Sequence, residues 1–139
     1  MEKATQTKTR VLVTDDEHNI RKIIKLILTH TYDVFEAESG EKALETLKNE
    51  DINIVFLDVV MPGLNGIETL EQIKLFNPEI EVCMVTATDN DILEAKANKL
   101  GAIGWLEKPF EVSQLLEIAK KMEMIIDVKQ RIRQAVPVF

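Results

Sequence analysis

Short apolar runs alternate with amphipathic segments from one end of this chain to the other. The apolar runs have strand length and many β-branched residues, whereas the segments between them repeat apolar residues at helical spacing. Each intervening segment is long enough for a helical crossover, so consecutive strands are expected to run parallel. We expect five strands, at residues 11–13, 34–37, 52–57, 81–86 and 103–106.

This order predicts an α/β fold in which a doubly wound, five-stranded parallel sheet of order 2-1-3-4-5 is covered by five helices, as in flavodoxin-like proteins. A closed barrel would need about eight strands, so an open sheet is favoured. The run at 52–57 is almost continuously apolar, which indicates a strand buried on both faces. Ser39 is placed to cap the second helix, and Gly101 is placed to end the fourth.

The composition argues against several classes of protein. The net charge of −7 disfavours nucleic-acid binding, whose affinity comes mainly from basic contacts to phosphates. No apolar run approaches the roughly 18 residues that span a bilayer, and the polar residues 1–9 predict a flexible lead rather than a secretory signal. Cys83 is the single cysteine, so we expect a buried small hydrophobic residue in a cytoplasmic protein without disulfides.

Acidic residues follow two strands that are neighbours in the predicted sheet. Asp15 and Asp16 come after the first strand, and Asp58 comes after the third. Three carboxylates that converge on one pocket repel one another, and a divalent cation would compensate them. Oxygen ligands select a hard ion such as Mg²⁺. The simpler alternative is that Asp15 and Asp16 cap the first helix and that Asp58 caps a turn.

Two further strand ends favour phosphoryl chemistry over capping. Thr86 closes the fourth strand and Lys108 closes the fifth. A carboxylate such as that of Asp58 can attack phosphorus and form an acyl phosphate, while a metal and the Lys108 ammonium stabilise charge on the transferring oxygens. The Thr86 hydroxyl can donate to a phosphoryl oxygen. The Lys108–Pro109 peptide bond, if cis, would fix the approach of the lysine.

The order and spacing of these motifs resemble the receiver domains of two-component response regulators over about residues 10–125. The resemblance implies that Asp58 accepts a phosphoryl group from a histidine kinase or a histidine phosphotransfer protein. It also implies that Mg²⁺ is bound by Asp16, Asp58 and the backbone carbonyl of Val60, with Asp15 acting mainly through water. The matching motifs are Asp15-Asp16, Asp58 in Asp-Val-Val-Met-Pro-Gly-Leu-Asn-Gly, Thr86-Ala87 and Lys108-Pro109-Phe110.

The resemblance also assigns residues to a conformational switch. Thr86, Ala87 and Lys108 belong to the phosphoryl-contacting group, and Trp105 occupies the position of an aromatic residue that swings inward when the threonine moves. The surface formed by the fourth helix and the fourth and fifth strands would then carry the output to a downstream protein.

Val60 and Thr88 lie two positions beyond Asp58 and Thr86, where members of this family tune the lifetime of the acyl phosphate. Valine cannot orient an attacking water, so slow loss of the phosphoryl group is expected. A phosphohydrolase resembling the haloacid dehalogenase family would place an aspartate at position 60 as general acid. A degenerate receiver would have lost an acid or the lysine. We therefore expect a regulated binding module rather than an enzyme.

The two histidines are interpreted as surface helix residues. Neither His18 nor His30 has a Cys or His partner at zinc spacing. A histidine near a helix end, such as His30, needs no further explanation than the helix dipole. The histidine that donates the phosphoryl group is expected on another protein.

Apolar residues recur at helical spacing well beyond what the last helix needs to cover its sheet. Residues 126–139 are therefore interpreted as an extension of that helix, compatible with a short heptad seam into which Lys129 would fall. A homodimer helix, a signalling helix that leads to an effector domain outside this chain, and a frayed end all remain open. The apolar positions are Leu115, Ile118, Ala119, Met122, Ile125, Ile126, Ile132 and Val136.

Overall fold

The computed structural model describes residues 8–135, in which strands and helices alternate as the hydrophobic pattern predicts. In chain order the strands are β1 (Arg10–Thr14), β2 (Asp33–Ala37), β3 (Ile54–Leu57), β4 (Glu81–Thr86) and β5 (Gly104–Glu107). The helices are α1 (His18–Leu28), α2 (Gly40–Asn49), α3 (Gly66–Phe76), α4 (Asp91–Lys99) and α5 (Val112–Ala135).

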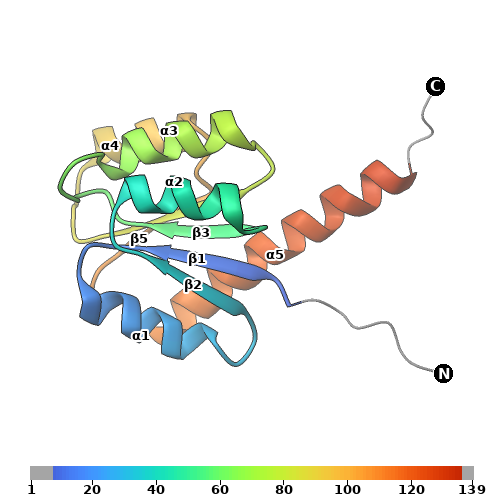
Figure 1. The fold of residues 1–139 in the computed structure, drawn as a ribbon, viewed down its shortest axis with the longest axis horizontal. Helices are drawn as coiled ribbons and strands as arrows, with labels where there is room; N and C mark the ends of the chain where they lie inside the picture. The colour runs from blue at the N-terminus through green and yellow to red at the C-terminus, as the bar shows by residue number, and fades with distance from the viewer. Residues whose placement is uncertain (1–7, 136–139) are drawn as a thin grey trace.

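Neighbouring strands are parallel throughout, and their order is β2-β1-β3-β4-β5 (Figure 1). This confirms the predicted topology. Because β1 pairs with β3, the carboxyl ends of these two strands lie side by side at the switch point of the sheet. The strand expected from residue 52 begins at Ile54, because the Ile52 amide instead donates to the Glu50 carbonyl at 3.0 Å.

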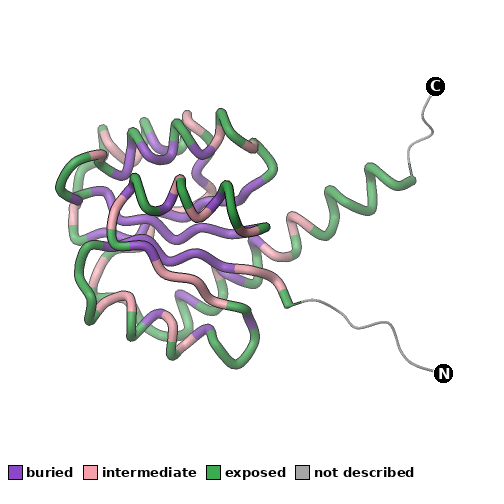
Figure 2. Tube along the Cα trace, viewed as in Figure 1, coloured by how far each residue is buried: buried purple, intermediate pink, exposed green. Residues whose placement is uncertain are grey.

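Helices cover both faces of the sheet (Figure 1). On one face α2, α3 and α4 pack through residues such as Ala43, Leu70 and Ala97. On the other face α1 and α5 pack through residues such as Ile24 and Leu115. Figure 2 shows that buried positions run along the central strands β1, β3 and β4, and every residue of β3 is buried. The prediction of a strand enclosed on both faces is therefore confirmed.

Local signals begin and end the helices where the sequence indicates. The Ser39 hydroxyl accepts from the Lys42 amide at 3.1 Å, which is the predicted cap of α2. Asn65 and Glu68 form a reciprocal capping box at the start of α3, at the end of the loop that follows Asp58. Gly101 follows α4 with a φ of 107°, a backbone conformation that favours glycine.

The second half of α5 projects past the amino-terminal edge of the strands (Figure 1). Most of the predicted heptad seam instead faces the sheet, because the same helical spacing describes a core face and a dimer seam. Val136 lies outside the described residues. Long as α5 is, no helix within residues 8–135 combines the length and the apolar character that a membrane span requires. The seam positions buried in or packed against the core are Leu115, Ile118, Ala119, Met122 and Ile126.

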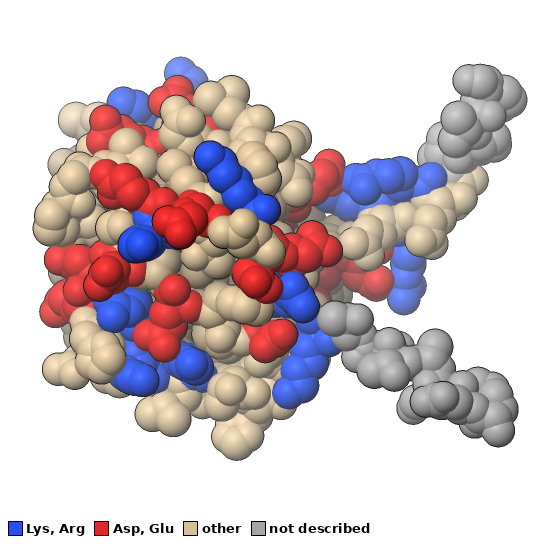
Figure 3. All heavy atoms as spheres, in the orientation of Figure 1, with Lys and Arg blue, Asp and Glu red and all other residues tan. Residues whose placement is uncertain are grey.

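Ion pairs connect the projecting part of α5 to the body of the domain. Lys129 Nζ lies 3.1 Å from Oε2 of the buried Glu81, and Arg133 Nη2 lies 2.7 Å from Glu79 Oε1. Figure 3 shows Lys and Arg side chains gathered along this part of the helix. Lys129 therefore faces the start of β4 and does not fall in an exposed seam.

Candidate functional site

The structure brings the three predicted acids together at the carboxyl edge of the sheet. Asp15 and Asp16 follow β1, Asp58 follows β3, and one carboxylate oxygen from each lies within 4.8 Å of the others. Asp15 and Asp58 are buried, whereas Asp16 is exposed. The pairing of β1 with β3 produces this convergence, since parallel neighbours end at the same edge.

Lys108 reaches into the acidic cluster from the end of β5. Its Nζ donates to Asp15 Oδ2 at 2.6 Å and to Asp58 Oδ2 at 3.2 Å, and it lies 3.8 Å from Glu17 Oε1. Burial by itself lowers the pKa of Lys108, but the hydrogen bond to Asp15 and the nearby carboxylates outweigh it, so the net pKa is raised. The lysine therefore stays charged at neutral pH and neutralises only part of the negative charge.

The surroundings of Asp15 disfavour its ionised form. Its pKa is raised above the ordinary aspartate value of 3.8, chiefly because burial disfavours the charged form and also because Asp58 lies close by. The hydrogen bonds from Lys108 and from the Glu17 amide act in the opposite direction and do not cancel this effect. An added cation would therefore stabilise the ionised cluster.

The capping alternative describes only one oxygen of each buried acid. Asp15 Oδ1 accepts from the Glu17 amide at 2.9 Å, and Asp58 Oδ1 accepts from the Val60 amide at 3.4 Å. The second oxygen of each carboxylate points instead to Lys108. The cluster is thus more than a pair of turns, and its all-oxygen donor set suits a hard divalent cation.

Thr86 and Lys108 are linked through the backbone of adjacent strands. The Lys108 amide donates to the Thr86 carbonyl at 2.9 Å, so these two strand ends stay in register. The Thr86 side chain is fully buried, and its hydroxyl oxygen accepts from the Thr88 amide at 3.2 Å. Ala87, between the two threonines, is exposed. The Lys108–Pro109 peptide bond, which the sequence leaves open between cis and trans, is cis.

Trp105 lies on β5 opposite Met84 and packs against the core beneath α2, α3 and α4. The residue is partly buried, and its indole Nε1 is buried without a hydrogen-bond partner among the described residues. A buried donor without a partner costs about 1–3 kcal/mol. A position in which Nε1 had a hydrogen-bond acceptor would therefore be favoured by removing this cost.

The remaining candidate residues are placed as follows. Val60 is 65% exposed beside the cluster, so it is open to solvent water. His18 and His30 are both exposed, as predicted, but only His18 belongs to α1, because His30 lies in the turn after the helix ends at Leu28. Cys83 is buried, which confirms the expected buried residue, and burial raises the pKa of its thiol to about 12.

Sequence reasoning missed Arg21, Glu17 and Glu36 around the acidic cluster. Arg21 Nη1 donates to the backbone carbonyl of Asp15 at 2.6 Å, and its Nε lies 3.3 Å from Glu36 Oε1. A cation one helical turn beyond an acidic strand end was the available signal. The hydrogen-bond acceptor of Arg21 is a backbone oxygen, which no side-chain pattern in the sequence reveals.

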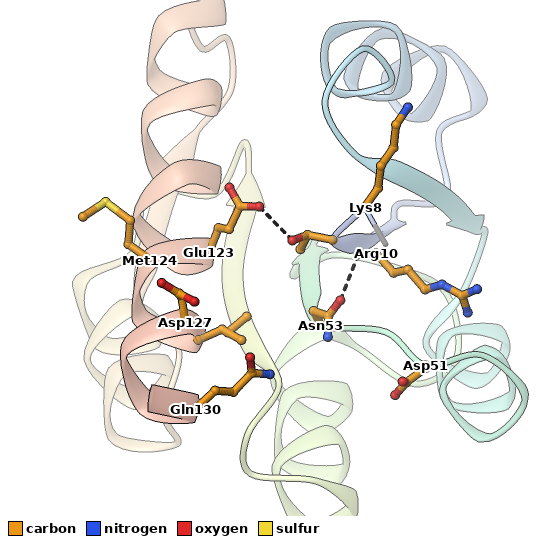
Figure 4. Close-up of a pocket in the computed structure, with 10 residues that line it drawn as sticks. Lys8, Arg10, Asp51, Asn53, Glu123, Met124, Asp127 and Gln130 are labelled. Carbon is orange, nitrogen blue, oxygen red and sulfur yellow. Dashed lines mark hydrogen bonds between the residues drawn. The ribbon is translucent and has the colours of Figure 1, made fainter. Parts of the chain in front are cut away.

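A separate groove of about 660 Å³ lies at the opposite edge of the sheet, between the start of β1 and α5 (Figure 4). Its two sides are tied together, since the Thr9 hydroxyl donates to Glu123 Oε2 at 2.8 Å. The Arg10 amide donates to Asn53 Oδ1 at 2.9 Å on the β3 side. No member of the acidic cluster lines this groove, so it is distinct from the candidate site.

Comparison with known families decides what kind of acidic cluster this is. A family model described as the response regulator receiver domain matches residues 11–120. The chain belongs to this family. It is a receiver domain of the two-component type. Receiver domains typically bind Mg²⁺ at a cluster of aspartates, and Asp15, Asp16 and Asp58 form a cluster of this kind.

Two relatives illustrate the match over the length of the receiver. Sporulation initiation phosphotransferase F of Bacillus subtilis is 30% identical over 113 residues, which cover 81% of this chain and 91% of that protein. Chemotaxis protein CheY of Halobacterium salinarum is 34% identical over 109 residues, which cover 78% of this chain and 91% of that protein. Both likenesses extend over nearly the whole of the relative.

Solved structures of similar proteins have the same fold as this chain. Vibrio cholerae CheY4 matches with a TM-score of 0.79 and 26% identity, covering 84% of this chain and 99% of that one. NtrX from Brucella abortus, in complex with ATP, matches with a TM-score of 0.88 and 27% identity, covering 96% of this chain and 31% of that one. The likeness to the longer protein NtrX thus extends over more of this chain than the likeness to CheY4.

Proposed function

We propose that this receiver accepts a phosphoryl group on Asp58 from a histidine kinase or a histidine phosphotransfer protein, and that phosphorylation changes its output surface. The observation that carries the proposal is the position of Lys108, which contacts both Asp15 and Asp58 from a third strand. The Lys108 ammonium is therefore positioned to stabilise a phosphoryl group on Asp58. Because Lys108 is already in place before the reaction, little reorganisation is needed to stabilise the charge on the transferring oxygens.

The proposed transfer uses few groups. A carboxylate oxygen of Asp58 attacks phosphorus, the new P–O bond forms as the bond to the donor histidine breaks, and that histidine leaves with the electron pair. Lys108 holds charge on the phosphoryl oxygens, and the Thr86 hydroxyl donates to one of them. Mg²⁺, held by Asp16, Asp58 and the Val60 carbonyl with Asp15 acting through water, supplies further positive charge when bound.

A regulatory role fits these residues better than an enzymatic one. Val60 occupies the position at which a hydrolase would need a general acid, and its side chain has no proton to give. The acyl phosphate is therefore proposed to persist and to act as a signal rather than as a short-lived intermediate.

The proposal is tested by incubating the chain with acetyl phosphate and Mg²⁺ and recording the intact mass. We expect one added phosphoryl group, which Asp58→Asn abolishes. Asp51→Asn is the matched control, because Asp51 is an exposed acid outside the cluster, and it should label like the wild type. Labelling that survives in Asp58→Asn would remove the basis for this function.

Trp105 is expected to report the switch through its fluorescence. Beryllium fluoride with Mg²⁺ mimics the phosphoryl group, and the proposed movement of Thr86 would give the indole, with its unpaired Nε1, a new environment. The emission maximum should shift when the mimic binds to the wild type and stay constant in Asp58→Asn. Stoichiometric binding of the mimic with an unchanged spectrum would argue that Trp105 is a static packing residue.

Val60 is expected to lengthen the lifetime of the acyl phosphate. Val60→Asn or Val60→Glu places a polar group that can orient water beside Asp58, so the half-life should shorten by about threefold or more. The measurement is loss of the phosphorylated mass with time after the phosphodonor is removed. Val112→Asn, at another exposed valine, is the control. Equal half-lives in all variants would exclude Val60 from this role.

The projecting part of α5 is proposed to pair with its counterpart in a second copy. Met124, Val128 and Ile132 recur at every fourth position, and their exposed fractions are 59%, 50% and 57%. Contiguous exposed apolar surface of this kind marks a contact site in a protein. The structural match to NtrX covers 96% of this chain and so includes part of the projecting helix, which supports an ordered helix here rather than a frayed end.

Light scattering on the intact chain should give the mass of a dimer. Val128→Glu places a charge within the apolar stripe and should give the monomer mass, whereas Gln130→Glu, also exposed but outside the stripe, should remain dimeric. A wild-type monomer would contradict self-pairing and would leave the stripe as a contact for a downstream partner or effector domain.

A further inference from the structure

The loop between β1 and α1 contains two neighbouring acids that are held very differently. Every polar group of Asp15 has a partner: its amide donates to the Ala37 carbonyl at 3.1 Å, and its carboxylate oxygens bind the Glu17 amide and Lys108. Asp16 is exposed, and no hydrogen bond to its side chain is found among the described residues. Its position therefore depends on the backbone that precedes it.

Arg21 forms a hydrogen bond with that backbone. The peptide unit that joins Asp15 to Asp16 is a rigid plane, so the direction of the Asp15 carbonyl also sets the orientation of the Asp16 amide. Arg21 Nη1 donates to this carbonyl at 2.6 Å. The carbonyl precedes α1, whose first backbone bond in this region runs from the Arg21 amide to the Glu17 carbonyl, so the helix itself does not satisfy it.

The guanidinium is in turn fixed from the opposite side. Arg21 Nε lies 3.3 Å from Glu36 Oε1 on β2, and only 11% of the Arg21 side chain is exposed. Lys25, one turn further along α1, pairs with the same glutamate at 3.5 Å, and within residues 8–135 it forms no hydrogen bond or ion pair with the acidic loop. Two cations thus share one acid, and only one of them contacts the backbone between the metal-binding acids.

We propose that Arg21 is a positioning residue for divalent-cation binding, which holds the Asp15–Asp16 peptide so that the Asp16 carboxylate faces the cluster. This role rests on the proposed function, because it presumes that the cluster binds Mg²⁺. Arg21 acts through Asp16 and does not itself contact the ion. Residues that orient metal ligands in this way typically change the affinity for the metal by about tenfold or more when they are removed.

Isothermal titration calorimetry with Mg²⁺ alone, on the intact chain, tests the proposal. Arg21→Met keeps the aliphatic stem and removes the donors, and it should weaken Mg²⁺ binding about tenfold. Lys25→Met removes an equal charge beside the same glutamate and should stay within about twofold of the wild type. Arg21→Lys, which restores charge and one donor, should fall between the two.

Circular dichroism at the titration temperature shows whether each variant is folded. If Arg21 only stabilised the fold, a folded Arg21→Met variant would bind Mg²⁺ with the wild-type dissociation constant. Wild-type affinity in folded Arg21→Met, or equal losses in Arg21→Met and Lys25→Met, would overturn the positioning role and leave the proposed function intact. A wild-type chain that binds no Mg²⁺ would overturn both the metal-dependent function and the role of Arg21.

Discussion

Gly66→Ala is expected to destabilise the domain by about 3 kcal/mol, because no space exists for a side chain at this position. A Cβ on Gly66 would overlap the carbonyl oxygen of Asp58 and would lie 2.6 Å from the Val59 Cα. Both are backbone atoms, which cannot rotate away as the end of a side chain can. The Gly66 amide also donates to the Val59 carbonyl at 2.8 Å, so the loop after Asp58 closes directly on the start of α3.

Urea unfolding measures this effect, and Gly104→Ala provides the control. A Cβ on Gly104 would meet Cys83 Sγ at 3.1 Å and Ile118 Cδ1 at 3.2 Å, and both of these are side-chain atoms. A loss of less than about 1 kcal/mol is expected there. Equal losses at the two glycines would mean that the close approach of α3 to Asp58 does not determine the stability of this loop.

Asp15→Asn is expected to stabilise the domain at neutral pH by about 1 kcal/mol when no divalent cation is present. The pKa of Asp15 is raised in the folded state, chiefly by burial, so its ionised form costs stability. The folded chain retains the Asp15 proton at pH values where the unfolded chain, in which this carboxyl has its ordinary pKa of 3.8, has lost it. The cost is complete above the raised pKa and disappears as the pH falls towards 3.8.

The gain from Asp15→Asn should therefore be largest near pH 7 and should shrink as the pH is lowered through the raised pKa of Asp15. Urea unfolding midpoints across this range measure it, and Asp51→Asn is the control at an exposed acid. Added Mg²⁺ should narrow the difference at pH 7, since binding to the folded cluster stabilises the wild type. A destabilised Asp15→Asn at pH 7 without metal would contradict the electrostatic account of the cluster.

The convergence of Asp15, Asp58 and Lys108 was predictable from the sequence because strand order alone places strand ends at one edge. Each residue directly follows or closes an apolar run, and parallel neighbours share their direction. The partners of these residues were less accessible. Arg21 binds a backbone carbonyl, and Gly66 matters through the closeness of two backbones, so neither leaves a periodic pattern of side chains.

The last helix shows what the spacing of apolar residues cannot predict. Its apolar spacing correctly predicted a long helix, but spacing does not say which face meets the sheet. Leu115 and Met122 proved to belong to the core, and Lys129 pairs with Glu81 across a distance in sequence that no local pattern reports. Trp105 was identified by position, whereas the unpaired state of its Nε1 depends on packing from several elements.

Hydroxylamine trapping tests the identity of the acceptor most directly. The chain is treated with acetyl phosphate and Mg²⁺, and hydroxylamine then displaces phosphate from an acyl phosphate to leave a hydroxamate on the same carboxyl carbon. Peptide mass spectrometry locates the modified residue. We expect the hydroxamate on Asp58 alone, and its loss when Mg²⁺ is omitted. A hydroxamate on Asp15, Asp16 or any other acid would contradict Asp58 as the phosphoryl acceptor.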